Sequence, residues 1–303
     1  MIYQNIAKIK HRAFSLIELS IVILIIGILV AGVTQSSRLV NQFRLTSAKN
    51  ITLNSPVATI KDLALWFDAV NEKGFDSQIS DGMGVAYWQD INPLNSTQLR
   101  ISQTNPPDQP LFVSNGINGL PSIKFNATSN NSRLMSYGMG AISRDSTIFL
   151  VLRWDIVSPV ISQSYIIHIG GDSPVASYLE AGMGNVGNMF FYFYPSGSFG
   201  GDSLSGTMPN NTNHIFRRIY NTRTNFSGIY LNGTNLSTST AYYPGNYSSN
   251  GNTLICLGNH FVAPRTFGGL FGEFIIFNRA LANDEIIDVE RYLSKKWSIK
   301  LSY

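Results

Sequence analysis

The chain has 303 residues, enough for one large domain or two small ones with an ample core. Hydrophobic residues make up 44% and charged residues only 13%, because Asn, Ser, Thr and Gly fill many of the polar positions. This composition is typical of a β-rich secreted domain, and the 12% of aromatic residues excludes a disordered chain.

The formal net charge of +4 is concentrated near the N-terminus. Residues 1–50 hold six basic side chains and one acidic side chain, Glu18. Residues 51–303 hold the remaining 16 of the 22 basic and 17 of the 18 acidic side chains, a balance of −1. Since a body this close to neutral lacks the positive surface of a nucleic-acid binder, we expect no nucleic-acid partner.

The N-terminal segment has the layout of a membrane-inserted leader. Residues 1–12 are polar and basic, and an apolar stretch runs from Ile21 to Val33. Glu18 is the only formal charge between Ala13 and Val33, so the run is just long enough to cross a bilayer as a helix. An ordinary signal peptide carries a small residue after its apolar run, whereas Ala13 lies before it.

The hexapeptide Ala13-Phe14-Ser15-Leu16-Ile17-Glu18 resembles the processing site of type IV pilins and type II secretion pseudopilins. The resemblance implies that a prepilin peptidase cuts between Ala13 and Phe14 and that Phe14 becomes N-methylated. It also implies assembly with other pilin subunits through the N-terminal helix, a single pass through the inner membrane and an extracytoplasmic body. After processing, the protein would lie in a surface pilus or a periplasmic pseudopilus. Ala13 departs from the glycine that is usual in the family.

Glu18 is the assembly residue that this resemblance implies. A carboxylate inside a membrane helix is costly unless it is paired, and the new ammonium of Phe14 on a neighbouring subunit would be its partner. The alternative is that Glu18 only reaches the lipid headgroups of an ordinary signal anchor. We expect the helix to run from Phe14 to about Lys49.

The body reads as many short strands separated by Asn, Gly, Ser and Pro, which predicts a mainly β jelly-roll sandwich. Asn232-Gly233 predicts a hairpin turn. A closing helix is expected over Asn283–Trp297, with Asn283 as its N-cap and an apolar face that packs on the sandwich. The expected strands are Ser122–Phe125, Thr147–Trp154, Tyr165–Gly170, Met189–Tyr194, His214–Tyr220, Ser227–Leu231, Leu254–Leu257 and Leu270–Phe277. The expected division is a leader at 1–13, a transmembrane and stalk helix at 14–50, a linker at 51–61 and a sandwich at 62–303.

Several ordered segments of the body resemble bacterial concanavalin A-like, laminin G-like domains. They are Leu65–Ala69 (LWFDA), Val85–Asp90 (VAYWQD), Asn115–Pro121 (NGINGLP) and Gly272–Leu281 (GEFIIFNRAL), followed by the closing helix. The resemblance implies a lectin-like domain whose partners are surface glycans or proteins. Sandwiches of this kind also serve as glucanases and as inert spacers.

Glucanases of this fold need two closely spaced carboxylates on one strand, and Gly272–Asn278 holds only Glu273. We therefore expect no enzymatic activity. Asp172 and Asp202 are candidate Ca²⁺ ligands in Gly-flanked segments, although solvated turns explain them better, and we expect no other cofactor. Cys256 reads as a buried core residue, with a reactive thiol as the alternative. No metal-ligand spacing links it to the four histidines, which are His11, His168, His214 and His260.

Aromatic residues fall into two groups. The four tryptophans lie in motifs or amphipathic faces that favour core packing over a sugar-stacking platform; they are Trp66, Trp88, Trp154 and Trp297. Five tyrosines in or beside loops are better candidates for a contact surface; they are Tyr192, Tyr194, Tyr242, Tyr243 and Tyr247.

The leading hypothesis is a minor pilin or pilin-like surface protein that displays a lectin-like adhesion domain on a type IV pilus-type fibre. A structural pseudopilin of a secretion machine is the first alternative. A membrane-tethered glycan-degrading enzyme is the second, and the single carboxylate in Gly272–Asn278 speaks against it.

Overall fold

The computed structural model describes residues 15–75, 79–129, 131–137, 145–155, 163–170, 177–184, 188–193, 202–240, 253–259, 265 and 267–303. The chain divides into two compact units, Met1–Arg44 and Leu45–Tyr303. The second unit is the body of the protein.

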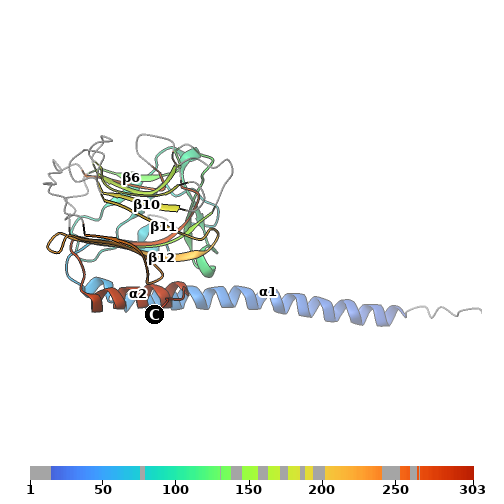
Figure 1. Ribbon diagram of the computed structural model, residues 1–303. Helices are drawn as coiled ribbons and strands as arrows, with labels where there is room; N and C mark the ends of the chain where they lie inside the picture. The colour runs from blue at the N-terminus through green and yellow to red at the C-terminus, as the bar shows by residue number, and fades with distance from the viewer. Residues whose placement is uncertain are drawn as a thin grey trace, which may run out of the picture. The chain divides into compact units, whose positions relative to one another are not determined.

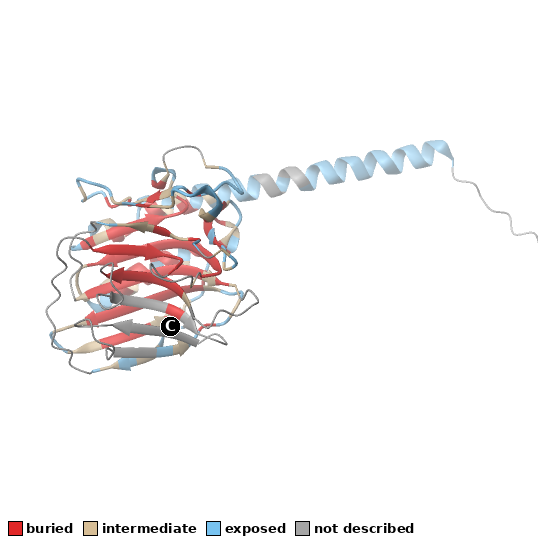
Figure 2. Cartoon of the chain, turned by 90° about the horizontal axis from the view of Figure 1, so that it is seen from above, coloured by how far each residue is buried: buried red, intermediate tan, exposed pale blue. Residues whose placement is uncertain are grey.

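The helix α1 (Leu16–Leu53) begins in the first unit and ends in the body. Its first 18 residues, Leu16–Val33, have a mean hydropathy of 2.9 and are all exposed, and they form a candidate membrane span. Figure 2 shows this run of exposed helix in pale blue. An apolar helix whose residues are all exposed suits a lipid or helix-bundle environment.

The described strands of the body form two antiparallel sheets, each of eight strands. Sheet I contains, in spatial order, β14 (Thr234–Ser239), β13 (Phe226–Leu231), β12 (Asn213–Asn221), β7 (Ser146–Trp154), β16 (Gly269–Phe277), β5 (Ser122–Phe125) and β4 (Leu111–Val113), and β1 (Leu63–Asp68) also pairs with β16. Sheet II contains β11 (Asp202–Thr207), β10 (Asn188–Phe193), β9 (Ser177–Gly184), β8 (Gln163–Gly170), β15 (Leu254–Leu257), β6 (Leu134–Ser136), β3 (Arg100–Ser102) and β2 (Tyr87–Gln89). Four short 3₁₀ helices connect them, namely Val57–Thr59, Glu72–Gly74, Pro106–Asp108 and Ile117–Gly119.

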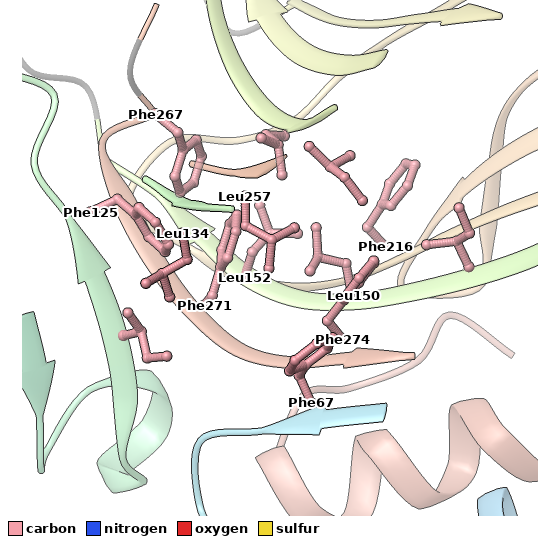
Figure 3. Close-up of a cluster of buried hydrophobic side chains, with 14 of the residues drawn as sticks. Phe67, Phe125, Leu134, Leu150, Leu152, Phe216, Leu257, Phe267, Phe271 and Phe274 are labelled. Atoms are coloured by element: carbon pink, nitrogen blue, oxygen red, sulfur yellow. The ribbon is translucent and has the colours of Figure 1, made fainter. Parts of the chain in front are cut away.

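The main core lies between the two sheets (Figure 3). Phe67 and Phe274 stack there with ring centroids 6.1 Å apart, and Phe125 meets Phe271 at 4.9 Å. A second apolar cluster covers the outer face of sheet I, where α2 (Asn283–Trp297) packs (Figure 1). The expected fold, a long N-terminal helix followed by a β-sandwich with a C-terminal helix, is therefore confirmed.

A β-bulge in β16 explains how both Phe271 and Phe274 face the core. The register to β7 shifts between Phe271 and Glu273, so Gly272 is the extra residue. Because of this shift, Glu273 points to the outer face of sheet I. Gly272 also leaves room for α2, since a Cβ there would lie 2.6 Å from the ring of Trp297.

The closing helix has the predicted limits, and Ile286, Val289, Leu293 and Trp297 are all buried. The predicted N-cap at Asn283 is wrong, because α2 begins at Asn283 and Ala282 is its N-cap. Glu285 does the capping instead: its carboxylate accepts a hydrogen bond of 2.9 Å from the backbone N–H of Ala282.

All eight predicted strands are present, with ends that differ by at most two residues. The hairpin turn is also confirmed: Asn232 and Gly233 have φ of 50° and 83° and join β13 to β14. The remaining strands were not predicted, and several are only three residues long, for example β2, β3 and β6. Runs this short show no alternation, so pairing with neighbours defines them.

The end of α1 is part of the body. The helix runs on to Leu53, so the first residues of the segment expected as a linker are helical. Ala48, Val57 and Ile60 are buried in the cluster on the outer face of sheet I, and Lys49 pairs with Glu72. The chain from Leu45 onward is thus packed against the sandwich.

Candidate functional site

The start of α1 carries the residue predicted to act in assembly. Glu18 lies in the first turn, and its carboxylate accepts a hydrogen bond of 3.0 Å from the backbone N–H of Ser15. The hydroxyl of Ser15 in turn faces the N–H of Ile17 at 3.4 Å. Ser15 and Glu18 thus form a capping box that stabilises the helix start. Ala13 and Phe14 lie outside the described residues, so the cleavage position stays a prediction.

A buried charged cluster joins α2, sheet I and the end of α1. The ammonium of Lys296 lies 2.7 Å from Asp68 Oδ2 and 2.8 Å from Glu273 Oε2, and all three side chains are fully buried. Asp68 and Glu273 are direct cross-strand neighbours on β1 and β16. We call Thr52, Trp66, Asp68, Glu273, Tyr292, Lys296 and Trp297 the junction cluster.

Glu273 is the centre of the junction cluster because four groups donate to its two oxygens. Oε1 accepts from the indole of Trp66 at 2.7 Å and from the Tyr292 hydroxyl at 2.6 Å. Oε2 accepts from Lys296 at 2.8 Å and from the indole of Trp297 at 2.7 Å. A buried carboxylate with this many donors is well compensated for its loss of water.

Thr52 connects the last turn of α1 to the same cluster. Its hydroxyl donates to Asp68 Oδ2 at 3.3 Å and lies 3.4 Å from the hydroxyl of Tyr292. Burial raises the pKa of Asp68 to about 6, while the Lys296 charge opposes this shift and the Glu273 charge adds to it. Burial and the two neighbouring carboxylates also raise the pKa of Tyr292 well above its ordinary value, so Tyr292 stays a neutral donor.

The junction cluster is structural in character, since no member that carries charge reaches the surface. The sequence interpretation considered Glu273 alone and missed its partners. A signal was available: Asp68 and Glu273 interrupt apolar strands, and Lys296 lies between Leu293 and Trp297 on the apolar face of α2. Charges at such positions indicate buried pairing.

A second candidate site is a depression of about 370 Å³ on the outer face of sheet II. Its described lining residues come from β3, β6 and the residues that flank them, and they are Ser102, Gln103, Thr104, Arg133, Met135, Ser136 and Tyr137. Leu134 and Ile101 point into the core between the sheets. Because side chains alternate along a strand, Arg133, Met135 and Tyr137 share the outer face with Ser102.

Cys256 and His168 lie next to this depression in the sheet. Cys256 pairs with Met135 on one side and with His168 on the other. Cys256 and His168 are both fully buried. Burial raises the pKa of Cys256 to about 12, which Arg133 partly offsets. The thiol therefore stays protonated, and the interpretation of Cys256 as a buried residue is confirmed.

The other predicted candidates are spread over the body. All four tryptophans are buried, as predicted. Tyr192 lies in β10, whereas Tyr194, Tyr242, Tyr243 and Tyr247 lie outside the described residues. Of the two candidate Ca²⁺ ligands, Asp202 begins β11 and Asp172 lies outside the described part. Burial lowers the pKa of His214, whose Nε2 lies 2.6 Å from Thr212 Oγ1. Within the described residues, no three His, Cys, Asp or Glu side chains group as metal ligands.

Comparison with known proteins identifies the N-terminal segment. Residues 8–34 match the prokaryotic N-terminal methylation motif. With the exposed apolar helix that begins at Leu16, this match gives the chain a pilin-like N-terminus that supports membrane anchoring. The motif implies processing by a prepilin peptidase and assembly with other pilin subunits. No curated protein sequence matches the chain.

Solved structures similar to the body include sialidase domains. The CBM40 domain of the Ruminococcus gnavus IT-sialidase, bound to alpha2,3 sialyllactose, is 14% identical, with a TM-score of 0.41 over 51% of this chain and 93% of that one. A Trypanosoma rangeli sialidase is 13% identical, with a TM-score of 0.48 over 80% of this chain and 34% of that one. The NanB sialidase of Streptococcus pneumoniae is 12% identical, with a TM-score of 0.43 over 55% and 26%. The chain thus spans about a third or less of these two sialidases, and at such scores the likenesses carry no conclusion about ligand or activity.

Proposed function

We propose that this protein is a minor pilin or pilin-like surface protein that displays a lectin-like adhesion domain on a type IV pilus-type fibre. The observation that carries the proposal is the continuity of the methylation motif at residues 8–34 with a helix that ends packed on a large β-sandwich. The bulk of this sandwich favours a minor subunit, because a large body is hard to repeat along a closely packed fibre. The proposal places the protein in the inner membrane before assembly, with a single pass and an extracytoplasmic body.

The packing of the body supports a display role. The outer face of sheet I is covered by α2 and by the end of α1, and the junction cluster fixes both. The outer face of sheet II instead carries the open depression lined by Arg133 and Tyr137. The proposal therefore assigns attachment to the outer face of sheet I and partner binding to the depression on sheet II. The proposal also assigns the sandwich to the concanavalin A-like, laminin G-like domains that its sequence resembles.

We also propose that the body is not an enzyme. Asp68 and Glu273 are cross-strand neighbours, and two closely spaced carboxylates are what glycoside hydrolysis uses. Both are fully buried and held by Lys296, so water and a sugar have no access to them. Incubation of the full-length protein with β-glucans and sialylated oligosaccharides should release no reducing sugar above the buffer blank.

Fibre fractionation tests the proposal. The tagged full-length chain, expressed in a bacterium with a type IV pilus, should appear in sheared fibres and disappear from them when the prepilin peptidase is deleted. A pseudopilin would instead stay with the cells and be required for secretion of an exoprotein. Retention in the membrane without either phenotype would overturn the assignment to both kinds of fibre.

A further inference from the structure

We propose that the depression on the outer face of sheet II binds a carboxylated saccharide, with Arg133 as the carboxylate ligand and Tyr137 as the ring contact. The inference rests on the proposed lectin-like function and names the ligand class for it.

Charge gives the first indication. Arg133 is the one charged side chain among the seven described lining residues, and the others are neutral polar residues, a methionine and a tyrosine. A guanidinium presents a planar fork of donors that matches a carboxylate with two parallel hydrogen bonds. A single cation suits a singly charged group better than a phosphate, which carries up to two charges.

The neutral lining residues give the second indication. Ser102 and Thr104 add two hydroxyl groups to the lining; Thr104 is exposed and Ser102 is half-buried. Tyr137 is 54% exposed, and it brings an aromatic ring to the lining of the same depression. Hydroxyl groups around a charged anchor, with an amphipathic ring at the edge, suit a polar ring that carries both hydroxyls and a carboxylate.

The position of these side chains is fixed by the sheet. Arg133 and Tyr137 flank β6, whose Leu134 is fully buried in the core, and Met135 pairs with both Ser102 and Cys256. The strand therefore presents its outer side chains from a rigid element. A volume of about 370 Å³ lies at the lower end of the range for ligand pockets, which suits a short saccharide or the end of a chain.

Matched probes test the ligand class. Full-length protein in detergent micelles is titrated with oligogalacturonate, oligoalginate and a hyaluronan tetrasaccharide, and with the fully methyl-esterified form of each. We expect at least one acidic probe to bind, and esterification to weaken its binding at least tenfold. Esterification keeps the ring and its hydroxyls and removes only the negative charge.

Variants test the residues. Arg133→Gln should weaken binding of the acidic probe at least tenfold. Arg133→Lys, which keeps the charge, should weaken binding less than Arg133→Gln does. Tyr137→Ala should weaken binding several-fold. Arg223→Gln is the matched control, because Arg223 is an exposed arginine in the turn between β12 and β13 of the other sheet. Each variant must unfold at the denaturant concentration of the wild-type protein for its binding constant to count. A variant that unfolds early is replaced by Ser102→Val, which removes one neutral hydroxyl from the lining and should weaken binding several-fold.

Two results would overturn the inference. Equal affinity for an acidic probe and its ester, or unchanged affinity in a stable Arg133→Gln variant, would remove the carboxylate contact. Binding of neutral glycans alone would defeat this inference and leave the proposed function standing. If no glycan of either kind binds while the protein is still found in fibres, the lectin-like part of the proposed function fails as well.

Discussion

Asp68 and Glu273 lie directly opposite each other on β1 and β16, and both carboxylates contact the ammonium of Lys296, at 2.7 and 2.8 Å. They are 205 residues apart in the chain, and all three groups are shut off from solvent. The same cluster includes Thr52 at the end of α1 and Trp297 at the end of α2. These side chains therefore tie the end of α1 and the end of α2 to sheet I.

Removal of the central cation should destabilise the body strongly. Lys296→Met leaves Asp68 and Glu273 buried without their counter-charge, and loss of one partner of a buried ion pair costs about 3–5 kcal/mol. Denaturant unfolding of the full-length protein in micelles, followed by tryptophan fluorescence, reports on the body alone because all four tryptophans lie in it. Lys295→Met is the control: Lys295 is exposed, so its loss should change the free energy of unfolding by less than about 0.5 kcal/mol. Equal stability of the two variants would show that the ion pairs contribute little.

Asp68 should make the free energy of unfolding fall as the pH rises. The pKa of Asp68 is about 6 in the folded state and 3.8 in the unfolded chain. Between these two pH values Asp68 is protonated in the folded state and ionised in the unfolded chain. The stabilisation is complete below about pH 4 and disappears as the pH rises through 6, a change of about 3 kcal/mol. The difference in unfolding free energy between the wild-type protein and Asp68→Asn, measured at pH 4, 5, 6 and 7, should shift in favour of the variant as the pH rises. A constant difference over this range would contradict the raised pKa.

Trp297 should be indispensable for the attachment of α2. Its ring is fully buried over Gly272, and its indole N–H donates to Glu273. Trp297→Ala should therefore lower the free energy of unfolding by about 3–5 kcal/mol. Trp297→Phe, which retains most of the ring but loses the donor, should cost less. If Trp297→Ala unfolds at the wild-type denaturant concentration, then α2 contributes no packing energy.

Glu18 should act in assembly and leave the body unaffected. It lies in the first unit, separate from the compact unit that begins at Leu45. Glu18→Ala should insert into the membrane and unfold like the wild-type protein, yet its amount in sheared fibres should fall tenfold or more, since loss of a poorly solvated pair costs a few kcal/mol. Glu72→Ala, which removes an exposed carboxylate of the body, should assemble normally. Normal incorporation of Glu18→Ala would count against the pairing with Phe14.

Processing is expected between Ala13 and Phe14. Mass spectrometry of the protein from fibres should find an N-methylated Phe14 as the first residue. Ala13→Gly should be cleaved at least as completely as the wild-type protein, because glycine is the residue usual at this position in the family that the motif resembles. A mature protein that begins at Met1, or one cut after Val33, would disprove a pilin-type maturation.

The sequence by itself determined the features that local patterns encode. The unbroken apolar run predicted the exposed helix, and the closing helix followed from its amphipathic face between Asn283 and Trp297. The long strands followed from their β-branched and aromatic runs, and the hairpin at Asn232-Gly233 from the positive φ that these residues accept.

Only the tertiary structure decided the features that depend on register. The bulge at Gly272 turns Glu273 outward, opposite Asp68, whereas regular alternation from Phe271 would point it into the core. The three-residue strands β3 and β6 exist because their neighbours pair with them, and that pairing gathers Arg133, Tyr137 and Ser102 around one depression. Such groups lie far apart in the chain and meet only when the sheets form. The contacts that hold them together are long-range, so no local pattern in the sequence predicts them.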